Sequence, residues 1–500
     1  MSNQTGDVHR VSGGAFLRSL DLLAATAVAE SEGQSPGMLT SAERAMLFEI
    51  VRRTWHGDGA IVDGGSFLGS SLVAEARGMQ ANPKLADLTL ARFPAGRPIH
   101  GYELGHHPAP ADPAAERRRT YGGVEYTLGE SFVSVLEQNI APHRDLIDLH
   151  VGDLTQMSWD ESPVEVAFID VCKTPELNAH VSRQFYPALI AGASRLIHQD
   201  FFFDRLPWIR VTMGYLADYF RWEGQVASSS VYTNVEAVPE DVAGYDPFTE
   251  ATLEECLAYH DAVAFPGIDR TARLMLALSR VQLILHKGSH EHALEQLQET
   301  AVEYVDILGA VSQPDSFRPP PGSPDTMLPR YRMDRALTRV LGGARTGDPR
   351  TGAGSSRPGA EPPSDLDQAR AALNRRSWDQ ARQILEPLAA ADPQGPAKFL
   401  LARTELEAGN QDSATAILDS LLSRCPRHHR ARALRARLHL ITGDLTAARH
   451  QADEALRGDP RLVSARRILF DVSVANRLQP QATRQPCLLP PQASDPRVIR

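Results

Sequence analysis

Cysteine and lysine are both scarce in this chain, and long apolar runs are absent. The four cysteines (Cys172, Cys256, Cys425 and Cys487) lie far apart and show no Cys-x-x-Cys spacing. This argues against a zinc module or a disulfide framework and favours a reducing cytoplasm. No run approaches the ~18 apolar residues of a membrane span, and the N-terminus lacks the basic and apolar regions of a secretory signal. We therefore expect a cytoplasmic protein without a membrane partner.

The chain also lacks a segment in which charge of one sign is concentrated. The net charge is −10, yet residues 365–477 hold 18 Lys+Arg against 14 Asp+Glu. Neither this stretch nor the remainder has the dense basic patch of a nucleic-acid binder, so no nucleic-acid partner is expected. Lysine occurs only at positions 84, 173, 287 and 398 while arginine is abundant, a bias that by itself says nothing about activity.

Strand and helix patterns alternate between residues 40 and 240. Thr40-x-x-Glu43 predicts a capping box at the start of a helix. The alternation predicts an α/β doubly wound domain, a parallel sheet with helices on both faces. A closing hairpin is expected at 225–238 and a helical extension at 241–313. The predicted strands are 60–63, 98–104, 146–151, 164–170 and 194–199, and the predicted helices are 70–80, 131–141, 176–190 and 208–221.

Proline, glycine and serine are dense between residues 314 and 364. Such a composition cannot bury enough apolar surface to order itself, so this stretch is a predicted linker, with the pattern of a short helix at 327–342. Residues 1–39 are expected to form an N-terminal segment, and residues 479–500 a disordered tail.

An internal repeat follows the linker. Ala381, Ala414 and Ala448 are separated by 33 and 34 residues, and a proline follows each alanine by twelve residues. Gly409 and Gly443 precede the second and third alanines by five residues, where the first unit has Arg376. In period and marker positions, residues 365–478 resemble tetratricopeptide repeats, which implies an all-α helical repeat domain with a concave surface for a partner. An unrelated helical bundle is the alternative.

The most informative motif is Ala60–Gly69. An apolar run ends in Asp63, and Gly65 and Gly69 follow as Asp-x-Gly-x-x-x-Gly. Glycine permits positive φ and leaves no Cβ between a loop and a ligand, so the motif predicts a cofactor-binding turn. Rossmann dehydrogenases have similar strings, but an NAD-dependent oxidoreductase is disfavoured because Ser66 stands where Gly-x-Gly-x-x-Gly needs its second glycine.

Acidic residues end the later strands. Glu103, Asp153, Asp170 and Asp200 follow the second to fifth predicted strands. The carboxyl ends of parallel strands meet at one edge of a sheet, and several carboxylates gathered in one cleft are costly unless a ligand or metal compensates them. The sequence therefore predicts a ligand site at this edge.

With these acids in place, residues 40–240 resemble the class I S-adenosylmethionine-dependent methyltransferases. The resemblance implies that Glu103 accepts both ribose hydroxyls of the cofactor. It also implies that Asp170 lies beside the substrate as a catalytic residue. The remaining implied cofactor contacts are Asp63, Gly64, Gly65, Ser66 and Gly69 around the methionine part, and Asp153 and Leu154 near the adenine.

Within that fold the chain looks most like the macrocin-type sugar O-methyltransferases. The resemblance implies that Asp170 and Asp200 bind a divalent metal such as Mg²⁺. Two departures stand against it: relatives carry further aspartates beside these positions, where this chain has Cys172 or Lys173 and Gln199. A third is the 40-residue step from Asp63 to Glu103, where a dinucleotide fold has ~20.

Each candidate has a structural alternative. Asp63 is either a cofactor contact or a helix cap, and Glu103 and Asp153 are either ligand contacts or solvated loop acids. His198 is either a general base for a hydroxyl or a structural hydrogen-bonding partner. The aromatic side chains Phe201, Phe202, Phe203 and Trp208 either wall a substrate pocket or pack the next helix, and His106 and His107 either contact substrate or are solvated.

The leading hypothesis is therefore a methyltransferase that moves a methyl group from S-adenosylmethionine to the hydroxyl of a sugar or another small molecule of secondary metabolism. Its repeats would bind a peptide, a carrier domain or a second copy of the chain. The alternative is a non-catalytic adaptor, in which a degenerate methyltransferase fold accompanies peptide-binding repeats.

Overall fold

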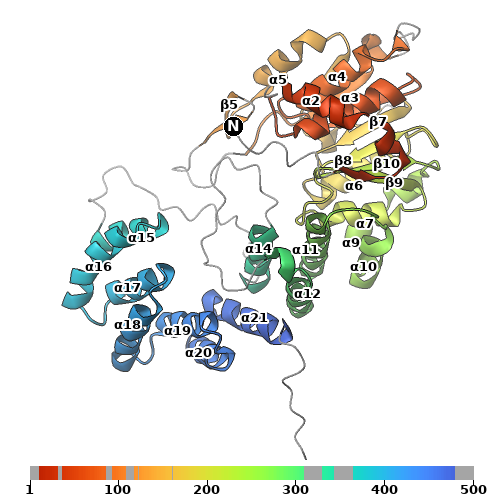
Figure 1. Ribbon diagram of the computed structural model, residues 1–500. Helices are drawn as coiled ribbons and strands as arrows, with labels where there is room; N and C mark the ends of the chain where they lie inside the picture. Colours follow the sequence, from red (N-terminus) through yellow and green to blue (C-terminus); the bar gives the residue numbers. More distant parts are fainter. Residues whose placement is uncertain are drawn as a thin grey trace, which may run out of the picture. The chain divides into compact units, whose positions relative to one another are not determined.

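The structure is a computed structural model that describes residues 11–31, 36–85, 90, 93–108, 117–121, 123–159, 162–308, 329–342 and 364–478 (Figure 1). The chain divides into two compact units. The first comprises Met1–Leu297 and Pro319–Ala360, and the second Gln298–Arg318 and Glu361–Arg500. The predicted tail 479–500 and most of the predicted linker lie outside the described residues.

The first unit is built on a mostly parallel sheet (Figure 1). Its described strands follow the order β1-β9-β10-β8-β7-β2-β3-β6, so the chain lays strands to one side of β2 and then to the other. In open α/β sheets such a reversal, here between β2 and β7, leaves a ligand crevice outside the carboxyl ends of the strands. The parallel strands are β2 (Ala60–Gly64), β3 (Ile99–Glu103), β6 (Ile147–Val151), β7 (Val164–Ile169) and β8 (Arg195–His198), and each agrees with its prediction to within one residue.

The other edge of the sheet is antiparallel. A hairpin is present as predicted, but it begins earlier than the expected 225–238: it is formed by β9 (Phe220–Val226) and β10 (Ser229–Asn234), and β10 pairs with β8. The helix predicted at 208–221 therefore ends at Tyr215. Beyond it, β1 (Val11–Gly13) pairs with β9. The N-terminal segment thus contributes a strand that its sequence pattern did not predict. A separate hairpin, β4 (Arg118–Tyr121) and β5 (Val124–Thr127), follows β3.

Helices cover both faces of the sheet, as predicted. One apolar core contains residues of α3, α4 and α5, and the other contains residues of α6, α7, α10 and α11. The predicted capping box is present, because Thr40 and Glu43 bond each other's backbone N–H at the start of α3. The helices up to residue 286 are α1 (Ala15–Ser19), α2 (Leu22–Ser31), α3 (Ser41–Thr54), α4 (Ser70–Gln80), α5 (Val133–Ile140), α6 (Pro175–Phe185), α7 (Pro207–Tyr215), α8 (Glu240–Gly244), α9 (Pro247–Glu250), α10 (Leu253–Ala262) and α11 (Arg270–His286). The division between the units falls within α12 (His290–Glu303), and α13 (Val305–Leu308) belongs to the second unit.

One segment of the predicted linker is a docked helix, α14 (Pro329–Gly342). Its Arg332 and Arg339 both pair with Asp204, at 3.2 and 2.7 Å, and the Asp204 side chain is fully buried. Arg332 also lies 4.1 Å over the ring of Phe203. This helix is therefore anchored on the loop that follows β8.

The second unit is a series of antiparallel helix pairs. The three marker alanines are fully buried. Gly409 and Gly443 have left-handed backbone, with φ of 89° and 83°, and Arg376 takes the same conformation at 59°. The marker residues therefore have the positions that the repeat pattern predicts. The alanines are the small residues at which helices approach each other, and the left-handed residues form the turn within each helix pair. The helices are α15 (Asp365–Asn374), α16 (Trp378–Ala391), α17 (Pro396–Glu407), α18 (Gln411–Arg424), α19 (His429–Ile441), α20 (Leu445–Gly458) and α21 (Val463–Leu478).

No helix in the described part of the chain is both long and apolar enough to cross a membrane.

Candidate functional site

Predicted acids of four strands meet at the carboxyl edge of the sheet. Asp63 ends β2, Glu103 ends β3, and Asp170 and Asp200 follow β7 and β8. The Asp170 N–H donates to the Gly64 carbonyl at 2.7 Å, which ties the end of β7 to the turn after β2. The charges of Asp170 and Glu103 both act on Asp63. The parallel register thus brings these carboxylates together, as the strand order requires.

The glycine turn after β2 is shaped by contact with its neighbours. Gly65 has φ of 98°, and a Cβ there would lie 2.9 Å from the carbonyl carbon of Asp170. Gly69 has φ of 90° and caps α4, and its Cβ would lie 2.8 Å from the Ile140 side chain. Both glycines are therefore required for the turn to lie against β7 and α5, in addition to any ligand.

Glu103 is fixed by one backbone donor of this turn and one of the loop after β3. The Phe67 N–H donates to Oε2 at 2.6 Å, and the Gly105 N–H donates to Oε1 at 3.0 Å. Phe67 has the unusual φ of 46°, a left-handed conformation that costs about 1–3 kcal/mol in a non-glycine residue. Each carboxylate oxygen keeps a further lone pair. Glu103 is thus oriented by the turn and can still accept hydroxyl groups.

Asp63 is a fully buried carboxylate with one satisfied oxygen. The Ser66 hydroxyl donates to Oδ1 at 2.9 Å, whereas Oδ2 has no hydrogen-bond partner among the described residues. Burial raises the pKa of Asp63 to about 7, and the nearby hydroxyls of Ser66 and Ser71 only partly offset it. An orphaned buried oxygen is costly, which marks this position as one that a ligand donor would stabilise.

Asp153 and Leu154 have local structural roles. Asp153 is exposed and caps a short 3₁₀ helix, with Oδ1 accepting from the N–H and hydroxyl of Thr155 at 2.9 and 2.8 Å. These hydrogen bonds lower the pKa of Asp153. Leu154 is buried in the apolar core. The adenine contact that the resemblance assigns to this pair stays a prediction.

The carboxylates of Asp170 and Asp200 share an ammonium group. Lys173 Nζ lies 2.5 Å from Asp170 Oδ1 and 2.8 Å from Asp200 Oδ2. The Asp200 backbone is left-handed, with φ of 59°, which turns the chain sharply after β8. These are the two residues that the resemblance assigns to a divalent metal. While Lys173 holds this position, the pair does not fit a second cation.

Burial and charge act in opposite directions on this ion group. Burial raises the pKa of Asp170, and the Lys173 ammonium opposes this effect. Burial disfavours the charged form of Lys173, but the two carboxylates outweigh it and raise the pKa of Lys173. Half of the Lys173 side chain is nevertheless exposed. The ammonium therefore remains charged at neutral pH, at the end of a half-exposed side chain.

Sequence reasoning missed a polar wall next to this group. Glu43 Oε1 accepts from the hydroxyls of Ser228 and Ser229 at 3.1 and 2.9 Å. The same hydroxyls donate to Gln199 Oε1. The charge of buried Glu43 acts on Asp170. The capping box was the only sequence signal for Glu43. Its other contact, between Oε1 and Ser228, joins residues more than 180 positions apart, and no local pattern predicts such a contact.

His198 lies in the core under α6. Its Nε2 is 2.6 Å from the Tyr186 hydroxyl, and its Nδ1 has no hydrogen-bond partner among the described residues. Burial lowers the pKa of His198 to about 3. A general base needs hydrogen-bond reach to the acceptor proton. The observed contact agrees with the structural alternative for this histidine.

Most of the aromatic candidates pack in the apolar core of the first unit. Phe201, Phe202 and Trp208 are nearly fully buried in the core. Phe203 is partly buried and lies beneath Arg332 of α14.

The two histidines after Glu103 differ from each other. His106 is exposed. His107 stacks on Phe67, with ring centroids 5.1 Å apart, and its Nδ1 is 2.9 Å from the Tyr126 hydroxyl. His107 therefore packs between Phe67 of the glycine turn and Tyr126 of the β4–β5 hairpin.

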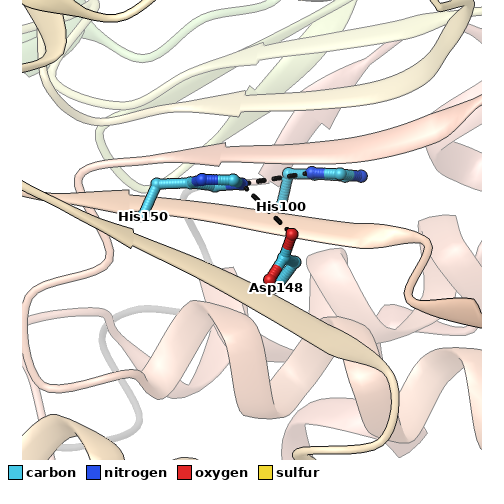
Figure 2. A group of neighbouring side chains, drawn as sticks. All are labelled: His100, Asp148 and His150. Atoms are coloured by element: carbon cyan, nitrogen blue, oxygen red, sulfur yellow. Dashed lines mark hydrogen bonds and ion pairs between the residues drawn. The ribbon is translucent and has the colours of Figure 1, made fainter. Parts of the chain in front are cut away.

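A second polar cluster lies away from this edge, on one face of β3 and β6 (Figure 2). His100 Nδ1 is 3.3 Å from His150 Nε2, and this nitrogen is 3.7 Å from Asp148 Oδ2. Within the described residues, this is the group of His, Cys, Asp or Glu side chains whose geometry suits a metal ion. It was not predicted, because His100 lies 50 residues before His150 in the sequence.

A pocket lies elsewhere in the first unit. A cavity of about 640 Å³ is lined by residues of α2, α3 and α4, and Gly69 is the one predicted site residue on its wall. Phe48 and Val73 contribute apolar surface, and Arg44 and Arg77 contribute charge. This pocket is separate from the carboxylates at the edge of the sheet.

In comparisons with known proteins, no family model matches this chain, and no curated protein does.

Proposed function

We propose that the first unit is an S-adenosylmethionine-dependent methyltransferase of the class I fold and acts on the hydroxyl of a small molecule. The observation that carries the proposal is Glu103, whose carboxylate is held at the glycine turn with lone pairs left for two hydroxyls. Buried Asp63, with its orphaned Oδ2, supports the same conclusion, because a cofactor amine or hydroxyl would satisfy it. The reversal of strand order between β2 and β7 supports a ligand at this edge.

The cleft then has two halves. The cofactor half contains Asp63, Gly65 and Glu103, and the acceptor half contains Asp170, Lys173 and Asp200. The cofactor supplies an electrophilic methyl group on a sulfonium. The residues of this chain contribute position and charge: Glu103 orients the ribose, and the acidic edge favours a positively charged ligand.

Calorimetric titration with S-adenosylmethionine tests this proposal. Wild type is expected to bind, and Glu103→Ala is expected to lose about 100-fold in affinity, because two hydrogen bonds to a charged group are removed. Glu130→Gln, an exposed acid before α5, is the matched control and should bind as wild type does. No binding to folded wild type would remove the enzyme and favour the adaptor alternative.

For the second unit, which we propose is a tetratricopeptide-like module, the groove suggests an acidic peptide as partner. A groove of about 340 Å³ is lined by residues of α17, α19 and α21. Its wall combines apolar side chains such as Phe399 and Leu434 with four arginines. The arginines are Arg403, Arg430, Arg437 and Arg467. Charge complementarity therefore favours a peptide that carries carboxylates beside apolar residues.

Fluorescence anisotropy of the full chain with a labelled Glu- and Leu-containing peptide tests this partner. Arg430→Glu should weaken binding, whereas Arg424→Glu on α18, outside the groove, should not. Binding should also weaken as salt rises. Equal affinity in both variants would contradict the assignment.

A further inference from the structure

Lys173 is held in a defined position at the start of α6. It directly precedes Thr174, which caps this helix by accepting from the Leu177 N–H, and its own N–H donates to the Val171 carbonyl at 2.6 Å. The side chain therefore leaves a tight turn three residues after Asp170 and reaches the carboxylates of two strands. A surface lysine on a flexible loop would have no such constraint.

The ammonium also compensates part of the negative charge of Asp170 and Asp200. Two carboxylates alone would repel each other, and a cation between them removes most of that repulsion. A lysine ammonium has three N–H donors, and within the described residues two of them bond Asp170 and Asp200. The third is left for an oxygen in the cleft, on the half-exposed side of Lys173.

We propose that the Lys173 ammonium takes the place of the divalent metal in the acceptor half and positions the acceptor hydroxyl through its third N–H. The catalytic part rests on the proposed methyl transfer. There, the acceptor oxygen bonds the methyl carbon as the carbon–sulfur bond breaks and its electron pair goes to sulfur. The hydroxyl proton passes to the Asp170 carboxylate. No metal ion is needed to balance this step.

Cation binding tests the substitution without relying on activity. Wild type is expected to show no Mg²⁺ or Ca²⁺ binding that depends on Asp170 when titrated by calorimetry. Lys173→Asp adds a third carboxylate and should gain Mg²⁺ and Ca²⁺ affinity by about tenfold or more, because hard cations prefer oxygen ligands. Lys84→Asp, at an exposed lysine, is the control and should gain none.

The outcomes separate the two proposals. Mg²⁺ binding by wild type that is lost in Asp170→Asn would overturn the substitution, as would methyl transfer abolished by a chelator. Should Lys173→Asp not fold, Lys173→Ala keeps the test open, because removal of the ammonium alone should expose the two carboxylates to added cations. Failure of S-adenosylmethionine to bind wild type would instead overturn the methyltransferase and leave the cation result standing.

An independent observation concerns the His100, Asp148 and His150 cluster. The three side chains share one face because His100 pairs with Asp148, and Tyr102 with His150, in the parallel register of β3 and β6. Figure 2 shows His150 Nε2 directed at both other side chains. The rings are held in place: Tyr102 stacks on His150 at 4.7 Å, and Trp159 packs edge-on against His100 at 5.1 Å.

The separations fit a shared ion. Two nitrogen ligands at about 2.05 Å from a tetrahedral Zn²⁺ lie about 3.3 Å apart, and the two imidazole nitrogens are 3.3 Å apart. Asp148 turns Oδ2 toward His150 at 3.7 Å, while Arg97 lies 3.6 Å from its other oxygen. Arg97 thus orients the carboxylate without occupying the atom that would bind a metal.

We infer that this cluster binds a borderline transition-metal ion such as Zn²⁺ or Co²⁺ and ties the edge strand β6 to β3. Imidazole with one carboxylate suits these ions, whereas Mg²⁺ prefers oxygen alone. Three protein ligands leave a fourth position for water.

Visible absorption of Co²⁺ added to the full chain tests this site. Wild type should take up one ion with tetrahedral absorption and gain thermal stability, and His150→Ala should lose both. Asp148→Asn serves if His150→Ala does not fold, and His106→Ala, at an exposed histidine, is the control. Absorption that persists in His150→Ala, or none in wild type, would overturn the site.

Discussion

In the cofactor half of the cleft, neutral donors hold the carboxylates of Asp63 and Glu103, whereas in the acceptor half Asp170 and Asp200 share the Lys173 ammonium. The difference indicates what each half can accept. The first pair has no cationic partner among the described residues, so this half attracts a cationic ligand with hydroxyl groups. The second pair is partly compensated by the ammonium, which lowers its net negative charge and suits an uncharged hydroxyl.

α14 is anchored on the loop that follows β8, beyond Asp200 of the acceptor half, and breaking this anchor has the largest expected effect on stability. Asp204→Asn removes the carboxylate that pairs with buried Arg332 and partly buried Arg339. Leaving these arginines unpaired should lower the free energy of unfolding by about 3–5 kcal/mol. Chemical denaturation measures the loss, and exposed Asp218→Asn is the control. An unchanged midpoint would show that α14 is not anchored through Asp204.

The cofactor half should show its uncompensated charge in the pH dependence of stability. Because the pKa of Asp63 is raised to about 7 by burial, the folded protein holds more protons than the unfolded chain between about pH 4 and pH 7. Stability contributed by this group is therefore lost as pH rises through that window. Asp63→Asn has no carboxyl to ionise, so it does not lose stability in this window. At pH 8 its free energy of unfolding should exceed that of wild type by an amount on the order of 3 kcal/mol.

Thermal unfolding from pH 4 to pH 8 measures this difference. Asp153→Asn is the matched control of opposite sign, because hydrogen bonds lower the pKa of exposed Asp153 and its contribution is lost only in acid. The same slope in wild type and Asp63→Asn would contradict a buried, strained carboxylate at this position.

Removal of the Lys173 ammonium should lower the rate of methyl transfer without changing the affinity for the cofactor. Lys173→Ala is expected to lower kcat for methyl transfer about 100-fold, as does the loss of one well-placed donor. Its affinity for S-adenosylmethionine should stay within about twofold of wild type, because the two halves are distinct. Lys84→Ala is the control. Equal losses in kcat and cofactor affinity would show that the halves are one site.

The smallest expected effect is on the stability of the second unit, and it tests the role of the left-handed position in each helix pair. Arg376 occupies the left-handed position that Gly409 and Gly443 fill in the following pairs. Arg376→Gly should raise the free energy of unfolding of the second unit by about 1 kcal/mol, and Gly443→Ala should lower it by a similar amount. Denaturant unfolding of the full chain checks both signs.

Much of the fold could be predicted because its signals are local. β2 and β7 are largely apolar and are buried at every residue, as parallel strands covered on both faces are. The predicted helix 176–190 ends at Phe185 instead, because Leu189 turns back to bridge Val164 beside the sheet. β1 has only three residues and depends on a partner strand more than 200 residues away.

The site was predictable in outline and not in its contacts. Strand ends identified Asp63, Glu103, Asp170 and Asp200, since parallel register brings such positions together. Lys173 was noted only as a departure from the metal-binding pattern. Its reach to Asp200 depends on the turn before α6 and on the left-handed backbone of Asp200, and neither can be read from spacing.

The most direct test is a calorimetric titration of S-adenosylmethionine into wild type, Glu103→Ala and Lys173→Ala under one set of conditions. The account predicts binding by wild type and Lys173→Ala, and a loss of about 100-fold in Glu103→Ala. Folded wild type that gives no heat, or a Glu103→Ala variant that binds as tightly as wild type, would contradict it.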